Sequence, residues 1–228
     1  NVRPEGLRSG VVYTDGQFDD SRLGVNLAQT IDDLGGCVIN YMEADGFIKN
    51  EGGQIIGVKA TDKISGQKYS IHCKVVINAT GVFANKVLSE DNPKHGKFIV
   101  PSQGIHIVLD KSFLMSDNAV MIPKTSDGRV LFIVPWHDKC LVGTTDVLVD
   151  EPSYEPRPLE KEIQFVMESA QKYLNKKPTR KDALSIFAGL RPLAAPKEKG
   201  KSTKEVSRSH KVIDGESAER ISLRIRHH

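Results

Sequence analysis

The stretch from Phe98 to Gly143 limits the fold most strongly, because extended segments follow one another there at short intervals. The segments are expected at residues 104–109, 119–123, 129–135 and 139–143. Ser126-Asp127-Gly128 lies between the second and the third, where aspartate and glycine accept the backbone angles of a tight reversal. Strands joined by such short turns pair side by side. The sequence therefore predicts a mostly antiparallel sheet.

A helix is expected next to this sheet. Its apolar residues recur at helical spacing, at Leu159, Ile163, Val166, Ala170 and Tyr173. Lys176 and Lys177 favour the carboxyl end of a helix, and Pro178 blocks its continuation. The helix should therefore end near Asn175.

The first ninety residues show a different order of elements. Asp19 and Asp20 precede a helical apolar face, and Gly35-Gly36 follows as a left-handed stop. That face consists of Leu23, Leu27, Ile31 and Leu34. The apolar run from Cys37 to Tyr41 then favours a buried strand.

A hairpin is expected after that strand, from residues 54–61 and 67–73, with Gly66 supplying a positive φ in the loop. The β-branched run from Lys74 to Gly81 ends in small residues. This pattern suits a central strand whose carboxyl end meets a ligand. Residues 10–88 therefore suggest α/β architecture.

Composition excludes several classes of protein. With 39% hydrophobic and 27% charged residues the chain is typical of globular proteins, and it shows neither an apolar run of bilayer length nor a leader pattern. Cys37, Cys73 and Cys140 form no Cys-x-x-Cys pair, and metal-ligand spacing is absent. The basic excess lies in residues 194–228, with nine basic against five acidic residues, and without aromatic side chains to stack bases. Nucleic-acid binding is not expected.

Two polar residues stand out within apolar surroundings. His106 lies in the alternating segment 105–109, so its ring should point to the face opposite Ile105 and Ile107. A lone strand histidine is usually structural. Arg191, between Leu190 and Pro192, keeps its charge and needs an anionic partner if it is buried. A local carboxylate or a bound phosphate would both satisfy it.

Three motifs stand out, namely Pro101-Ser102-Gln103-Gly104-Ile105-His106, the stretch from Pro123 to Asp146, and Phe187-Ala188-Gly189-Leu190-Arg191-Pro192-Leu193. Together they resemble the FAD-dependent glycerol-3-phosphate dehydrogenases, and the resemblance extends from about Gly10 to Lys211. The resemblance implies a partial FAD-binding domain of the two-dinucleotide-binding-domain flavoprotein type, plus a mostly antiparallel substrate-domain sheet with a flanking helix. The expected class is α/β (α+β). We expect domains at 1–92 and 93–196, followed by a basic loop, a return strand and a vector-derived tail at 197–228.

The resemblance also assigns roles to residues. It implies that His106 faces the substrate, where a neutral imidazole could accept the proton of a secondary alcohol. Arg191 would contact the substrate, and Arg208 would be a second phosphate-binding arginine. The cofactor-binding residues would be Ala44, Ala79, Thr80 and Gly81. Asp146 belongs to the family pattern too, although it could merely cap the following turn.

The sequence departs from the family at both ends. The fingerprint Gly-x-Gly-x-x-Gly, whose backbone N–H groups hold the cofactor pyrophosphate, is absent. The family's Gly-Gly-Lys motif is also absent, and the sequence diverges after about Ile221. We therefore expect a central fragment that does not retain FAD and is inactive alone.

The resemblance implies that the full-length protein oxidises sn-glycerol 3-phosphate to dihydroxyacetone phosphate by hydride transfer to FAD. A quinone or oxygen would then accept the electrons. Two alternatives stay open, namely a catalytically silent anion-binding fragment and a related flavoprotein that oxidises a 2-hydroxy acid or an amine. We expect a cytoplasmic location. Members of this family often associate peripherally with the inner face of the cytoplasmic membrane.

Overall fold

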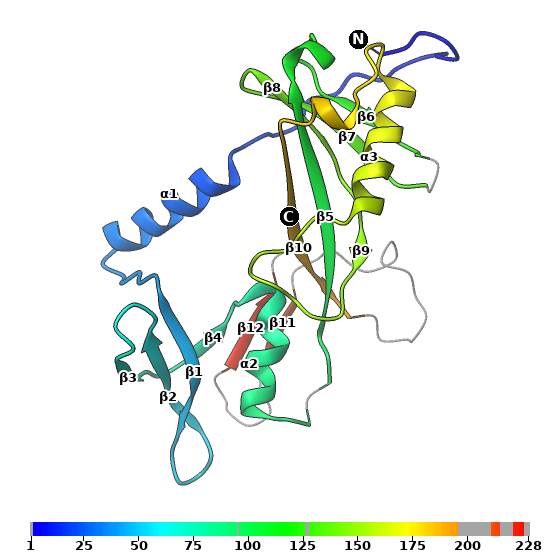
Figure 1. The fold of residues 1–228 in the computed structure, drawn as a ribbon. Coiled ribbons are helices and arrows are strands. Elements are labelled where there is room, and N and C mark those ends of the chain that lie inside the picture. The colour runs from blue at the N-terminus through cyan, green and yellow to red at the C-terminus, as the bar shows by residue number, and fades with distance from the viewer. Residues whose placement is uncertain (1, 95, 126–127, 196–210, 215–220, 226–228) are drawn as a thin grey trace. The chain divides into compact units, whose positions relative to one another are not determined.

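The computed structural model describes residues 2–94, 96–125, 128–195, 211–214 and 221–225. The chain divides into two compact units (Figure 1). One runs from Gly6 to Val76, and the other comprises the described residues from Ile77 onward together with residues 2–5. Each is described by itself. The domain boundary expected at residue 92 stays a prediction, because compact units and functional domains need not coincide.

The larger unit is built on an antiparallel sheet with strand order β10-β5-β8-β7-β6, and β9 pairs with β5. Its strands are β5 (Ile99–Asp110), β6 (Val120–Ile122), β7 (Leu131–Trp136), β8 (Lys139–Gly143), β9 (Val147–Leu148) and β10 (Ser185–Ala194). The predicted antiparallel sheet is confirmed. The strand that carries His106 is longer than expected, because β10 pairs with it along ten residues.

Helix α3 (Glu160–Tyr173) packs against this sheet and covers its apolar face (Figure 1). Ile105, Ile107 and Leu109 of β5 are 0% exposed and belong to one core cluster with the apolar side of α3. Burying each such side chain contributes roughly 1.5–3 kcal/mol. The short 3₁₀ turns η2 (Lys111–Phe113) and η3 (Arg180–Asp182) follow β5 and precede β10.

The predicted central strand from Lys74 to Gly81 is much shorter in the structure. Only β4 (Val76–Asn78) is extended, in a small sheet of order β11-β12-β4. The turn η1 (Gly81–Phe83) and helix α2 (Ala84–Asp91) follow it, and the other two strands are β11 (Lys211–Asp214) and β12 (Ile221–Ile225). The run is cut short because Ala79 and Thr80 turn the chain into η1, where Phe83 N–H donates to the Thr80 carbonyl.

The smaller unit contains α1 (Asp20–Asp33) and a meander of β1 (Met42–Lys49), β2 (Ile55–Asp62) and β3 (Lys68–His72). The predicted helix is confirmed, with Asp19 accepting a hydrogen bond from Arg22 N–H and Gly35 at φ 79°. The β2–β3 hairpin is confirmed as well.

The strand predicted from Cys37 to Tyr41 is wrong. These residues are irregular and exposed, and the strand begins only at Met42. An apolar run becomes a strand only beside a partner, and among the described pairings none reaches residues 37–41. Ala44 therefore lies within the meander, where it pairs with Ala60, and not at the end of a preceding buried strand.

Candidate active site

Strands β5 and β10 bring His106 and Arg191 to the same face of the sheet. Their antiparallel register places His106 opposite Phe187, Gly104 opposite Gly189, and Ser102 opposite Arg191. Because every second residue of a strand points to the same side, these three pairs share one face. It is the face opposite the one that α3 covers. We call it the open face.

His106 is half-buried, and its ring is held from two sides. It stacks on Phe187 of β10, with ring centroids 5.4 Å apart and planes inclined by 20°. On the other side Gly143 of β8 lies so close that an added Cβ would stand 2.5 Å from His106 Cδ2. Glycine at 143 therefore leaves the space that the imidazole occupies.

Arg191 is half-buried, and its guanidinium is fixed by the segment that follows β8. Nη2 donates to Thr144 Oγ1 at 2.8 Å and Nη1 donates to the Thr145 carbonyl at 3.1 Å. The guanidinium lies directly over Gly104, where a Cβ would come within 2.5 Å of Nη1 and of Thr144 Oγ1. Arg191 thus leans along the strand toward His106.

Glycines separate the imidazole from the guanidinium. Gly104 and Gly189 are paired across the two strands between His106 and Arg191. A Cβ built on Gly189 would meet nothing within 4 Å. The open face therefore combines a proton acceptor, a permanent cation and bare backbone, which suits a small anionic alcohol beside a flat ring.

Sequence reasoning missed the polar groups beneath this face. Glu162 of α3 is 2% exposed and accepts hydrogen bonds from Thr145 Oγ1 at 2.5 Å and from Gln103 Nε2 at 2.7 Å. One signal could have found it, because Glu162 is an acidic residue on the apolar side of the predicted helix. Asp146, in the segment between β8 and β9, accepts a hydrogen bond from Ser102 Oγ of β5.

The structure says less about the other predicted site residues. Arg208 lies outside the described residues. Ala79 and Thr80 are exposed after β4, and Gly81 adopts φ 57° with nothing within 4 Å of a built Cβ. Asn78 is buried there and binds Thr80 Oγ1 and the Ala84 carbonyl. This open, small-residue strand end fits the close approach of a cofactor. Ala44 belongs to the smaller unit and is exposed.

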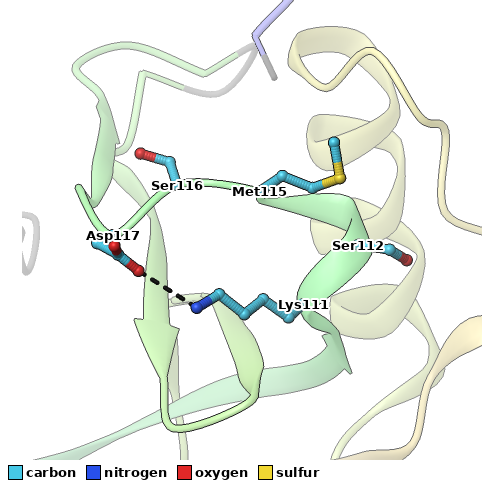
Figure 2. Close-up of a pocket in the computed structure, with 5 residues that line it drawn as sticks. All are labelled: Lys111, Ser112, Met115, Ser116 and Asp117. Atoms are coloured by element: carbon cyan, nitrogen blue, oxygen red, sulfur yellow. Dashed lines mark hydrogen bonds and ion pairs between the residues drawn. The ribbon is translucent and has the colours of Figure 1, made fainter.

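The structure also has a hollow at the other end of β5. It has a volume of about 420 Å³ and is lined by Lys111, Ser112, Met115, Ser116 and Asp117 (Figure 2). Lys111 Nζ pairs with Asp117 Oδ1 at 3.2 Å. Because Lys111 is already paired with the Asp117 carboxylate, the hollow is a poor site for an anion.

No group of three His, Cys, Asp or Glu within the described ranges is arranged to hold a metal. The described helices are all too short or too polar to cross a membrane.

The model of the family called FAD dependent oxidoreductase matches residues 1–211, nearly the whole chain. The chain belongs to this family. A mixed α/β fold with antiparallel sheets, as found here, is the fold of its glycerol-3-phosphate dehydrogenase members.

Two curated relatives illustrate the similarity. A mitochondrial glycerol-3-phosphate dehydrogenase of Arabidopsis thaliana is 39% identical over 213 residues, which are 93% of this chain and 34% of that protein. The mitochondrial glycerol-3-phosphate dehydrogenase of Saccharomyces cerevisiae is 35% identical over 238 residues, 90% of this chain and 37% of that protein. The chain thus spans about a third of the length of the curated relatives it matches.

Solved structures agree on the fold. The glycerol-3-phosphate dehydrogenase from Bacillus halodurans, solved in complex with FAD, superposes with a TM-score of 0.84 at 29% identity, covering 97% of this chain and 42% of that one. Glycine oxidase from Bacillus cereus superposes with a TM-score of 0.63 at 18% identity, covering 90% of this chain and 50% of that one, and shows the fold alone.

Proposed function

We propose that this chain is the central section of an FAD-dependent glycerol-3-phosphate dehydrogenase. The full-length protein would oxidise sn-glycerol 3-phosphate to dihydroxyacetone phosphate. The observation that carries this proposal is the common face of His106 and Arg191, separated by the Gly104–Gly189 pair. The substrate offers matching chemistry, with a phosphate dianion at one end and a secondary alcohol near it.

Arg191 binds the phosphate. Its planar guanidinium presents two N–H groups in parallel, which match two phosphate oxygens, and its charge persists at every working pH. Thr144 and Thr145 hold it from behind, so little side-chain entropy remains to be lost when the anion binds. A positioned phosphate in turn fixes the alcohol two carbons away.

His106 accepts the hydroxyl proton of the substrate. Stacking on Phe187 and contact with Gly143 orient its ring, so that a ring nitrogen can lie within hydrogen-bond reach of the alcohol. FAD, when bound, supplies the acceptor for the hydride that leaves C2. As the C2–H bond breaks, His106 takes the hydroxyl proton, so that positive charge does not build up on the carbinol.

The remaining assignments extend this proposal. Arg208 would be a second phosphate-binding arginine, and we expect Ala79, Thr80 and Gly81 to bind the cofactor; the role of Ala44 in cofactor binding also stays a prediction. This chain alone is expected to lose FAD, because it lacks the backbone grip on the pyrophosphate. A quinone or oxygen takes the electrons. The cytoplasmic location, with peripheral membrane contact, stays a prediction. Since similar proteins are named as mitochondrial, cell fractionation would distinguish the two compartments.

Turnover by the full-length protein tests the proposal. We expect oxidation of glycerol 3-phosphate with a kcat/KM far above that for 2-hydroxyglutarate, and a large fall in kcat/KM for Arg191→Ala. The matched control is Arg180→Ala, an exposed arginine of η3, which should leave kcat/KM unchanged. Preference for 2-hydroxyglutarate would instead support the hydroxy-acid alternative, in which Arg191 binds a carboxylate. Turnover of neither substrate by the full-length protein would overturn the dehydrogenase proposal.

A further inference from the structure

Glu162 occupies a buried position that helix formation alone does not require. Its carboxylate accepts three hydrogen bonds, from Thr145 Oγ1 at 2.5 Å, from Gln103 Nε2 at 2.7 Å and from Leu159 N–H at 3.1 Å. The last of these closes the first turn of α3, a role that an exposed glutamate could fill equally well. Burying a carboxylate is costly unless hydrogen bonds compensate. The two side-chain donors therefore indicate a second role.

The hydrogen bonds continue from Glu162 to the open face. Thr145 Oγ1 donates to Glu162 and accepts from Ile105 N–H at 3.0 Å, so this hydroxyl is fixed on both sides. The carbonyl of the same residue accepts from Arg191 Nη1. Thr144, the next residue back, accepts from Arg191 Nη2. A carboxylate on the α3 side of the sheet is thus linked to the guanidinium on the other side.

We propose that Glu162 is a positioning residue for Arg191. Glu162 holds Thr145 in place by a hydrogen bond. Thr144 and Thr145 in turn set the plane and position of the Arg191 guanidinium. The inference rests on the proposed function, in which Arg191 binds the substrate phosphate. Without Glu162 the guanidinium keeps its charge but loses its fixed orientation, so the anion binds more weakly.

Conservative variants of the full-length enzyme test this link. Glu162→Gln removes the charge at constant shape, and Thr145→Val removes the hydroxyl at constant volume. We expect each to raise the KM for glycerol 3-phosphate about tenfold, with a smaller change in kcat, because ground-state and transition-state binding weaken together. Calorimetric titration with inorganic phosphate should show the same weakening without turnover. Thr145→Ser keeps the hydroxyl and should restore binding.

Two further controls separate positioning from general damage. Glu168→Gln changes an exposed glutamate of the same helix and should leave KM unchanged. Thermal unfolding midpoints and flavin absorbance show whether each variant is folded and loaded. If Thr145→Val does not fold, Glu162→Gln alone is compared with the wild type for KM and for phosphate binding.

A double-mutant cycle gives the decisive outcome. In an Arg191→Ala background Glu162→Gln should change the Kd for phosphate less than about twofold, since coupled residues are not additive. An equal effect in both backgrounds, or no effect of Glu162→Gln in the wild-type background, would overturn the inference. The proposed function fails differently, through an Arg191→Ala variant that binds phosphate and glycerol 3-phosphate as tightly as the wild type.

Discussion

The two faces of strand β5 differ in what holds their residues in place. On one face Ile105, Ile107 and Leu109 are fully buried beneath α3. On the other face His106 is half-buried, and Phe187 of the neighbouring strand is 46% exposed. Two glycines, Gly104 and Gly189, oppose each other there. The same strand thus contributes to the core and to a surface that its own fold leaves open.

The contrast between the two faces of β5 shows which residues serve stability and which serve function. Glycine within a strand costs roughly 0.5–1 kcal/mol relative to alanine, and an exposed phenylalanine contributes little to stability. Neither the two glycines nor the exposed phenylalanine stabilises the sheet. Both suit a face that a substrate and a flat cofactor approach closely. Substitutions on the core face should therefore change unfolding, whereas substitutions on the open face should change turnover.

The largest effect is expected at His106. In the full-length enzyme His106→Asn should lower kcat by about 10³-fold, because a positioned general base contributes on this scale. Its stability should change little. The matched control is His137→Asn, since His137 is an exposed histidine of the β7–β8 turn at φ 51°, a conformation that asparagine tolerates. Steady-state kinetics measure both. A kcat for His106→Asn within a factor of ten of the wild type would remove the imidazole from the mechanism.

A core-face substitution should produce the reverse pattern. Leu109→Ala removes a fully buried side chain on the same strand, and should lower the free energy of unfolding by about 3 kcal/mol. Because Leu109 points away from the open face, KM at low temperature should be unchanged. Phe187→Ala is the matched open-face variant, with a stability loss below about 1 kcal/mol but a clear fall in kcat/KM. Urea titration and steady-state kinetics would show whether the two faces are as independent as we expect.

The sequence predicted the local part of this arrangement. Alternation along residues 105–109 placed His106 opposite the core residues, and turn chemistry predicted the antiparallel pairing of β6 and β7. Helical spacing predicted α1 and α3. These signals are read within a few residues, so no knowledge of distant partners is needed.

The register between strands that are distant in the chain could not be predicted from the sequence. The pairing of Gly104 with Gly189 and of Ser102 with Arg191 depends on how β10 aligns with β5, although the paired residues are 85 and 89 positions apart in the chain. The hydrogen bonds from Arg191 to Thr144 and Thr145 depend on the same alignment. The strand predicted at residues 37–41 failed for a related reason, since apolar composition does not say whether a partner strand is present.

The glycine pair offers a finer test of the open face. Gly104→Ala places a Cβ within 2.5 Å of Arg191 Nη1, so the guanidinium must move, and we expect KM for glycerol 3-phosphate to rise about tenfold. Gly189→Ala meets no protein atom within 4 Å and should leave stability unchanged or slightly higher. If Gly189→Ala nevertheless raises KM, the space above it belongs to the bound substrate or cofactor. Equal KM values for Gly104→Ala and wild type would show that Arg191 adapts freely.

The smallest effect is expected at Cys140, which belongs to the core side of the sheet. Burial, together with the smaller effect of the nearby Asp110 carboxylate, raises the pKa of the Cys140 thiol to about 11. The native state therefore keeps the proton where the unfolded chain begins to lose it. The stability contribution is full below the ordinary thiol pKa and is lost as the pH rises toward 11, so that between pH 7 and pH 9 the loss stays below about 1 kcal/mol.

Alkylation distinguishes this thiol from an exposed one. At pH 8 iodoacetamide should modify Cys37, which is exposed, while Cys140 should react only after denaturation, because thiolate and not thiol is the nucleophile. Mass spectrometry of the digested protein measures both sites in one sample, so Cys37 serves as the internal control. Rapid modification of native Cys140 would mean that the β7–β8 side of the core opens to solvent. In that case the contrast between the covered and the open face would be weaker than the static structure indicates.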